Sequence, residues 1–229
     1  MNASELLGRA TTPDGSDLSL LRRGSEYVIL ADGKALMSSR MHGSEEALAS
    51  FGCERARRME EPCVLVGGLG MGFSLRATLD LLPSGATVVV SELLPAIVEW
   101  NRDILGPLAD HPLRDRRVKV ELGDVARTLR DSRQRFDAIL LDVDNGPSAF
   151  AQATNGALYA DAGLATARAA LRPEGVYAVW SAKEDVKFQH RLRHNGFRVA
   201  THSVRARLKR GGPRHTIFVG VPSSPLPDS

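Results

Sequence analysis

Residues 60–82 read "EEPCVLVGGLGMGFSLRATLDLL", and this stretch decides the fold. The apolar residues 64–66 lead directly into four glycines within six positions, and a pattern with helical spacing follows. A strand, a tight turn and a helix are therefore expected here. The glycines either let the backbone pack closely or leave space for a bound ligand, because glycine has no Cβ. The rest of the chain has to decide between these two interpretations.

The same order of strand and helix continues to the end of the chain. Strands are expected over residues 63–67, 86–92, 117–124, 136–144 and 172–182, and helices over residues 72–82, 94–105, 125–131, 157–171 and 183–196. Two final strands, 197–206 and 214–222, are expected to be joined as a hairpin. Apolar strands that alternate with helices predict a parallel sheet covered on both faces. Ligands bind such sheets at the carboxyl ends of the strands.

The N-terminal part has a different pattern. Short apolar runs over residues 18–38 are broken by Arg-Gly-Ser and Asp-Gly, which predicts a small antiparallel hairpin or meander. A helix is expected next, with Ser44 as its N-cap and Glu45 and Glu46 in its first turn. We therefore divide the chain into an N-terminal tail and β-hairpin (1–43), a ligand-binding α/β domain (44–222) and a flexible tail (223–229).

The composition is that of an ordinary globular protein, with 43% hydrophobic residues and a net charge of +3. No run approaches the roughly 20 apolar residues of a membrane span. The N-terminus also lacks the apolar core of a secretion signal. We therefore expect a cytoplasmic protein without a membrane partner. The 2 cysteines and 6 histidines have no metal-ligand spacing, so no metal site is expected.

Positive charge is concentrated late in the chain, over residues 190–215. A basic edge of this kind attracts an anionic substrate or nucleic acid. The alternative is that these side chains are simply solvated on the faces of strands and a loop.

Glycines and an acidic residue follow the first two expected strands. Gly68, Gly70 and Gly72 form a pattern one residue shorter than the G-x-G-x-x-G dinucleotide fingerprint. Glu92 ends the second strand, about 20 residues further on, where an acidic side chain accepts hydrogen bonds from both hydroxyls of a ribose. On its own, Glu92 is equally well a surface carboxylate.

The third and fourth strand ends carry further acids. Asp124, after Gly123, either accepts a hydrogen bond from an exocyclic amine such as that of adenine or caps the next helix. Asp142 and Asp144 point to the same side if the fourth strand continues. They are candidates for chemistry, or turn-forming residues ahead of a proline. Taken together, the four strand ends indicate an adenosine-bearing cofactor, for which the glycines make room.

This order of motifs resembles the class I S-adenosylmethionine-dependent transferases, and within them the spermidine synthase family. The resemblance covers about residues 18–205. The segments that carry it are "VILADGKALMSS" (28–39), "VLVGGLGMGFSLRATL" (64–79), "VVVSELLPAIVEWNRDIL" (88–105), "VELGDVARTL" (120–129), "FDAILLDVDNGPS" (136–148) and "ALYADAGLATARAALRPEGVYAV" (157–179). It implies an α/β fold: a Rossmann-like, seven-stranded, mostly parallel sheet with helices on both faces and an antiparallel last strand, preceded by a small N-terminal β-hairpin.

The resemblance also implies a role for each candidate residue. Glu92 would bind the cofactor ribose, Asp124 with Gly123 would bind the adenine amine, and the glycines at 68, 70 and 72 would line the cofactor. Asp142, beside the cofactor, and Asp144 would face an amino acceptor at the catalytic centre. The cofactor would be S-adenosylmethionine or decarboxylated S-adenosylmethionine. Members of the family commonly form dimers, so a homodimer stays open as an expectation.

The acceptor side departs from the family pattern. The family's D-E-x-x-Y-H-E segment reads "MHGSEEAL" (41–48) here, and Met37 stands where the family usually has Gln. Because some of the groups that hold a polyamine are missing, we expect methyl transfer to a small acceptor, for which an amine is one candidate. The alternatives are aminopropyl transfer of the spermidine synthase type, methylation of an RNA docked on the basic segment, and a module that binds without catalysis.

Overall fold

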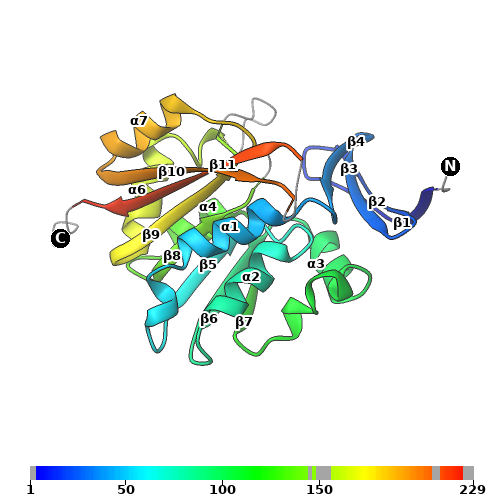
Figure 1. Cartoon of the computed structure of the whole chain (residues 1–229), viewed down its shortest axis with the longest axis horizontal. Coiled ribbons are helices and arrows are strands. Elements are labelled where there is room, and N and C mark those ends of the chain that lie inside the picture. The colour runs from blue at the N-terminus through cyan, green and yellow to red at the C-terminus, as the bar shows by residue number, and fades with distance from the viewer. Residues whose placement is uncertain (1–3, 144–145, 148–155, 208–211, 224–229) are drawn as a thin grey trace.

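The structure is a computed structural model that describes residues 4–143, 146–147, 156–207 and 212–223. Within these residues the strands form two sheets, a large one between layers of helices and a smaller one beside the N-terminus (Figure 1). None of the helices in these ranges has the length and apolar character needed to cross a membrane.

The large sheet confirms the expected architecture. Its strands are β5 (Cys63–Gly67), β6 (Thr87–Glu92), β7 (Val118–Leu122), β8 (Phe136–Leu141), β9 (Leu171–Ser181), β10 (Phe197–Arg205) and β11 (Arg214–Pro222). In the described part of the chain the order is β10-β11-β9-β8-β5-β6-β7, which makes seven strands. The pairs from β9 to β7 are parallel, whereas β11 runs antiparallel to both of its neighbours. The prediction of a mostly parallel sheet with an antiparallel last strand is therefore correct.

The order of the strands places a crevice beside β5. The chain runs outward from β5 to β6 and β7, then returns to the other side of β5 as β8. Connections that leave two adjacent parallel strands in opposite directions form a topological switch point at the strands' carboxyl ends. The glycine loop follows β5 and Asp142 follows β8, so both lie at this point.

Helices cover both faces of the large sheet. They are α1 (Gly43–Gly52), α2 (Phe73–Leu81), α3 (Pro95–Arg102), α4 (Val125–Arg130), α6 (Asp161–Ala170) and α7 (Val186–His194), with 3₁₀ turns η1 (Ala56–Arg58), η2 (Gly106–Ala109) and η3 (Pro112–Arg114). Val64 and Val66 of β5 belong to the hydrophobic cluster that contains α1, α2 and α3, whereas Leu65 belongs to the cluster with α4, α6 and α7. Successive side chains of a strand point to opposite faces, so β5 supplies both cores.

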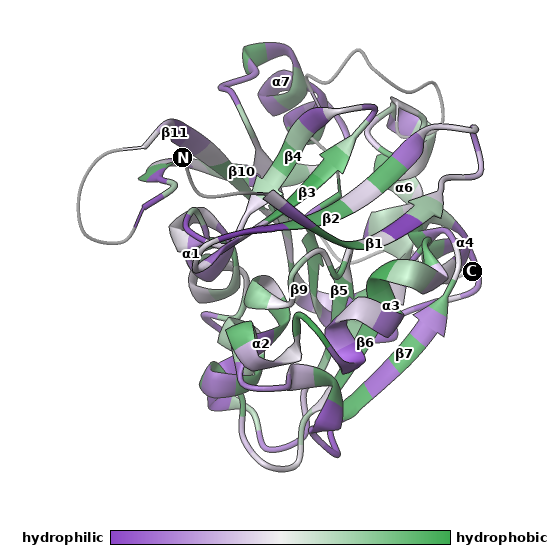
Figure 2. Ribbon diagram, turned by 90° about the vertical axis from the view of Figure 1, so that its right-hand side faces the viewer, coloured by the Kyte–Doolittle hydropathy of each residue, from purple (hydrophilic) through white to green (hydrophobic). Residues whose placement is uncertain are grey.

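The hydropathy of the strands follows their position in the sheet. All residues of β5 after Cys63 are buried, as expected for a central parallel strand covered on both faces. The edge strand β7 instead alternates hydrophobic and hydrophilic residues, which Figure 2 shows as alternating green and purple. This difference marks β5 as the centre of the core and β7 as the edge.

The N-terminal unit is larger than the expected hairpin. It is a four-stranded antiparallel sheet of β1 (Ser4–Thr11), β2 (Asp17–Arg23), β3 (Glu26–Ala31) and β4 (Lys34–Ser38) in sequence order. The sequence analysis missed β1 because "SELLGRAT" has only a short apolar pair, and its edge position depends on pairing with β2. The division of the chain at residue 43 stays a prediction, and of the expected tail (223–229) all residues but Ser223 lie outside the described residues.

The small sheet packs against the large domain. Leu18 and Leu20 of β2 share a hydrophobic cluster with Leu48 of α1 and Trp100 of α3. A Cβ on Gly8 of β1 would lie 2.6 Å from Nε1 of Trp100, so the strand passes directly over this ring. The small sheet therefore closes over the side of the molecule that holds the glycine loop.

The N-cap prediction for α1 is wrong by two residues. The helix begins at Gly43, and its N-cap is His42, which makes no side-chain capping bond. Ser44 lies inside the first turn and is fully buried. Its hydroxyl is therefore free of the capping role and contacts other side chains.

Because β5 contributes side chains to both hydrophobic cores, shortening a side chain on β5 should destabilise the protein more than shortening one on the edge strand β7. Leu65→Ala removes a side chain with 0% exposure, and we expect it to lower the free energy of unfolding by about 2–5 kcal/mol. Leu122→Ala on β7, where the side chain is 60% exposed, serves as the matched control and should change it by less than about 0.5 kcal/mol. Urea unfolding measures both variants, and similar losses would contradict the assignment of β5 as the shared core strand.

Candidate active site

The candidate site lies where β5, β6 and β8 end. The N–H of Gly68 donates to the carbonyl of Ser91 at 2.9 Å, and the N–H of Asp142 donates to the carbonyl of Gly67 at 2.8 Å. These two hydrogen bonds continue the sheet ladder into the loops. They bring the glycine loop and the residue after β8 into direct contact.

Close packing accounts for two of the three loop glycines. Gly68 has φ +90°, and a Cβ there would lie 2.3 Å from the carbonyl oxygen of Asp142. Gly72, with φ +84°, would place a Cβ 2.9 Å from Oδ1 of Asn101. The interpretation that these glycines make room for a cofactor is therefore not needed to explain Gly68 and Gly72.

Two other glycines face more open surroundings. A Cβ on Gly70 would meet only the Met37 side chain, with Sδ at 3.4 Å. A Cβ on Gly123 would have no other atom within 4 Å. At Gly70 and Gly123, no neighbouring backbone occupies the space that a Cβ would take. Met37, the residue that stands where the family usually has Gln, belongs to β4, the last strand of the small sheet. Its side chain lies next to Gly70 of the glycine loop.

Glu92 is buried and holds the glycine loop in place. It is 8% exposed, and its Oε2 accepts from the N–H of Leu69 at 2.8 Å while Oε1 accepts from the N–H of Leu94 at 2.9 Å. Burial raises the pKa of Glu92, and the hydrogen bonds from the backbone oppose this effect. The backbone N–H groups of Leu93 and Gly70 also act on this carboxyl group, so the glycine loop and the start of α3 surround it with donors.

Asp124 caps a helix at the next strand end. Its Oδ1 accepts from the N–H of Ala126 at 2.8 Å, and Asp124 is the N-cap of α4. The preceding Gly123 donates its N–H to the carbonyl of Glu92 at 2.9 Å, which ties this strand end to β6. The capping alternative for Asp124 is confirmed. Because the residue is exposed at the same edge, its role toward an adenine amine stays a prediction.

Asp142 is the titratable residue at the end of β8. Its Oδ2 accepts from the hydroxyl of Ser74, in the first turn of α2, at 2.5 Å. Burial raises the pKa of Asp142 to about 6, and the hydrogen bond from Ser74 opposes the rise. The carboxyl group therefore titrates close to neutrality. Asp144, its expected companion, lies outside the described residues.

Glu45 faces Asp142 from helix α1. Burial, and next the negative charge of Asp142, raise the pKa of Glu45 to about 8, while a hydrogen bond from Ser44 lowers it. The Ser44 hydroxyl donates to Oε2 of Glu45 at 2.6 Å. The sequence analysis assigned Glu45 only to the first turn of a helix. It missed the pairing with Asp142 because the two residues are far apart in the chain and meet only when α1 packs beside the end of β8.

Histidine and aromatic side chains surround these carboxyls. Nδ1 of His215, at the start of β11, lies 2.8 Å from the Ser44 hydroxyl, and the ring of Trp180 packs edge-on against His215. His42 stacks on Phe73 at a centroid distance of 4.2 Å. Burial lowers the pKa of His215, which favours its neutral form. No group of three or more His, Cys, Asp and Glu side chains within the described ranges is placed to hold a metal.

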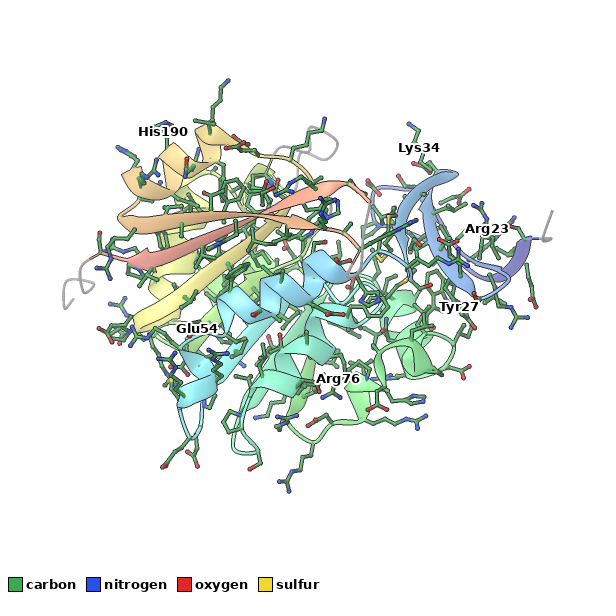
Figure 3. All side chains as sticks on the ribbon, in the orientation of Figure 1. Arg23, Tyr27, Lys34, Glu54, Arg76 and His190 are labelled. Atoms are coloured by element: carbon green, nitrogen blue, oxygen red, sulfur yellow. The ribbon has the colours of Figure 1, made fainter. Side chains whose placement is uncertain are left out.

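A separate hollow lies at the other end of the sheet. It has a volume of about 690 Å³ and is lined by side chains of α2 and of residues 114–117. Two of its arginines are paired with acids of the same hollow, Arg76 with Asp80 at 2.6 Å and Arg117 with Asp115 at 2.7 Å. Figure 3 labels Arg76 on α2. The hollow borders the amino ends of β6 and β7, so it is distinct from the candidate site.

The contact between the glycine loop and Asp142 predicts a large penalty for a side chain at Gly68. Gly15 has φ +89°, almost the +90° of Gly68, but a Cβ there would meet nothing within 4 Å. Gly68→Ala and Gly15→Ala therefore share the same backbone strain. We expect Gly68→Ala to lower the free energy of unfolding by about 1–3 kcal/mol more, through overlap with the Asp142 carbonyl. If urea unfolding showed the same loss of unfolding free energy for both variants, the loops after β5 and β8 would be able to move apart at little cost.

The burial of Glu45 predicts an unusual dependence of stability on pH. In the folded protein Glu45 keeps its proton up to pH about 8, whereas the ordinary value is 4.5. The folded state thus binds a proton that the unfolded chain loses, so this group's contribution to stability falls as pH rises through that window. Glu45→Gln cannot ionise. Its melting temperature should therefore rise relative to the wild type between pH 5 and pH 8, by at least about 2 °C.

The exposed Glu99 of α3 provides the control for this measurement. Glu99→Gln should keep a constant difference from the wild type over the same range in thermal scans. A constant difference for Glu45→Gln as well would mean that Glu45 ionises as a solvated carboxyl does.

Comparisons with known proteins agree with this geometry. The family model described as the spermine/spermidine synthase domain matches residues 41–204. No curated protein sequence matches the chain. A solved spermidine synthase in complex with the transition state analogue AdoDATO has a TM-score of 0.72 and 16% identity, over 94% of this chain and 72% of that one. A spermidine synthase from Thermotoga maritima has a TM-score of 0.73 and 15% identity over the same shares.

At these identities the two solved structures establish the likeness of the fold. The family assignment rests on the match of the family model, which spans more than half of the chain. Together with the sheet order and the strand-end loops described above, this match identifies the chain as a member of the spermine/spermidine synthase family.

Proposed function

We propose that the protein transfers the aminopropyl group of decarboxylated S-adenosylmethionine to a small amine. The sequence analysis favoured methyl transfer because acidic and aromatic groups that hold a polyamine were missing. The membership of the spermine/spermidine synthase family supports the aminopropyl alternative instead. The observation that carries the proposal is Asp142 held by Ser74 at the end of β8, with the buried Glu45 close enough for the charge of Asp142 to act on it, because this provides a second carboxyl group beside the proposed reaction centre.

The residues at the ends of β5, β6 and β7 are suited to hold the nucleoside of the donor. Glu92, at the end of β6, places its carboxyl group against the glycine loop, where the ribose hydroxyls would lie. Gly70 and Gly123 leave the backbone bare, and the second oxygen of Asp124 is available beside them. When bound, the donor supplies a carbon next to a positively charged sulfur, and the sulfur leaves with the bonding electron pair.

Asp142 and Glu45 are suited to hold and deprotonate the acceptor. The ionised carboxyl group of Asp142 attracts a cationic amine, and the attraction is strong where the groups are partly removed from water. An ammonium group must lose a proton before its nitrogen can attack. Asp142, whose pKa burial raises to about 6, is a better proton acceptor near neutral pH than an ordinary aspartate. Ser74 orients this carboxyl group through its hydrogen bond.

Methyl transfer from S-adenosylmethionine is the second candidate. It is favoured by the segment "MHGSEEAL", which lacks the Asp, Tyr and His of the family pattern, and by Met37 in place of Gln. These changes argue for a smaller acceptor than a long polyamine. A basic segment that docks RNA stays a prediction, because residues 208–211 lie outside the described ranges.

The nucleoside product distinguishes the two reactions. The protein is incubated with a panel of small diamines and either decarboxylated or ordinary S-adenosylmethionine, and the products are identified by mass spectrometry. Aminopropyl transfer leaves methylthioadenosine and requires the decarboxylated donor. Methyl transfer leaves S-adenosylhomocysteine. We expect the first result, with loss of turnover in Asp142→Asn. Formation of S-adenosylhomocysteine alone, or no product from either donor, would overturn the proposal.

The assigned role of Glu92 predicts a loss of donor affinity on truncation. Glu92→Ala leaves the ribose hydroxyls without a charged acceptor and should weaken binding by about 1–3 kcal/mol. Isothermal titration with the decarboxylated donor measures this, with Glu99→Ala as the exposed control. Because Glu92 also fixes the N–H of Leu69, thermal scans without ligand should accompany it. Unchanged affinity in Glu92→Ala would restrict Glu92 to its structural role.

A further inference from the structure

Three elements that are distant in sequence meet beside Asp142. The start of α1 is anchored to the last hairpin of the sheet, because the N–H of Gly43 donates to the carbonyl of Ala206 at 2.8 Å. Further along α1, Phe51 stacks on His202 of β10 at a centroid distance of 3.9 Å. These contacts fix the first turn of α1 between the end of β8 and the start of β11.

A continuous row of hydrogen-bonding groups results from this packing. Oε2 of Glu45 is 2.6 Å from the hydroxyl of Ser44, and the same hydroxyl is 2.8 Å from Nδ1 of His215. Ser44 is fully buried, whereas His215 is partly exposed at the start of β11. The row therefore leads from a carboxyl group that faces Asp142 toward the surface of the sheet edge.

The Ser44 hydroxyl has one proton and two neighbours that can each give or take one. When Glu45 is ionised, Ser44 donates to it and Nδ1–H of His215 donates to Ser44. When Glu45 is protonated, it donates to Ser44, and Ser44 donates to the unprotonated Nδ1. Both arrangements satisfy every hydrogen bond with the same heavy-atom positions. A proton can thus move along the row without rearrangement of the backbone.

We propose that Glu45, Ser44 and His215 form a proton relay that removes the proton lost by the acceptor nitrogen. This inference rests on the proposed function, since that reaction forms an N–C bond and releases one proton from nitrogen. Asp142, whose charge acts on Glu45, takes this proton, and a proton then enters the row at Glu45. Glu45 passes a proton to Ser44, Ser44 passes its own to Nδ1 of His215, and the ring releases one from Nε2 to water. One proton enters the row and one leaves it.

The charges around the row favour the entry of a proton at Glu45 and its release from His215. Glu45 is faced by Asp142 from β8 and by Glu46 from its own helix, and both negative charges favour its protonated form. Glu46 is itself paired with His42 at 2.7 Å. His215 is faced by Ser44 and by the uncharged ring of Trp180, and burial lowers its pKa. A neutral imidazole is able to accept a proton and to return it to solvent.

Nuclear magnetic resonance of the histidine side chains tests the row without any turnover. In the wild type, the ring nitrogen shifts of His215 should report a second titration, at the pH where Glu45 ionises. Ser44→Ala and Glu45→Gln should each remove it. His190, exposed on α7 (Figure 3), is the internal control and should titrate identically in all three proteins. Absence of the second titration in the wild type would overturn the relay, whatever the activity.

Kinetics test whether the row carries the proton of the reaction. Ser44→Ala and His215→Ala should lower kcat about tenfold or more near neutral pH, with the KM for the amine changed much less. Added imidazole should restore kcat in His215→Ala, and a series of substituted imidazoles should do so in order of their basicity. A purely structural His215 would not give this dependence. His190→Asn should keep the kcat of the wild type.

The two proposals fail in distinguishable ways. If no amine is turned over with either donor, the proposed function is wrong, and the histidine titration alone decides whether Glu45 and His215 are connected. If amines are turned over, a kcat of Ser44→Ala equal to that of the wild type would overturn the relay even when the two residues titrate together.

Discussion

The close approach of Gly68 to the Asp142 carbonyl is the constraint on which the site depends. Two parallel strands, β5 and β8, lie side by side at the point where the chain changes direction across the sheet. Their loops can continue together only because residue 68 has no Cβ and adopts a positive φ. This contact sets the position of Asp142, and through Ser74 it also relates the carboxyl group to the start of α2.

Buried charge is the second organising feature, and each carboxyl group is compensated in a different way. Glu92 is held by two backbone N–H groups, which stabilise its ionised form against burial. Asp142 and Glu45 each accept a hydrogen bond from a serine hydroxyl, and the charge of Asp142 favours the protonated form of Glu45. The same sheet edge therefore contains a carboxyl group bound by backbone N–H groups on one side of β5 and an electrostatically coupled pair of carboxyl groups on the other.

Much of the architecture was predictable from local pattern. Strand and helix alternation, the apolar run of β5 and the acids at strand ends indicated the order of elements and the location of Glu92, Asp124 and Asp142. The strand β1 was not predictable, because an edge strand with little apolar character is defined by its partner. The N-cap of α1 was misplaced for a related reason: Ser44 suits a cap by composition, yet it lies two residues after the N-cap and is buried by packing.

The sequence by itself determined that this chain forms a doubly covered parallel sheet with acidic loops at the carboxyl ends of its strands. The spacing of apolar residues, the positions of the glycines and the positions of the charged residues are local features of the sequence. They favour the same helix, strand or turn in whatever part of the fold the segment lies. Only the tertiary structure decided that Gly68 and Gly72 serve packing, that Glu92 fixes the glycine loop, and that Glu45 joins Asp142 and His215. Those relations depend on contacts between α1, β8 and β11, which are set by how the helices pack on the sheet and leave no mark in any single segment.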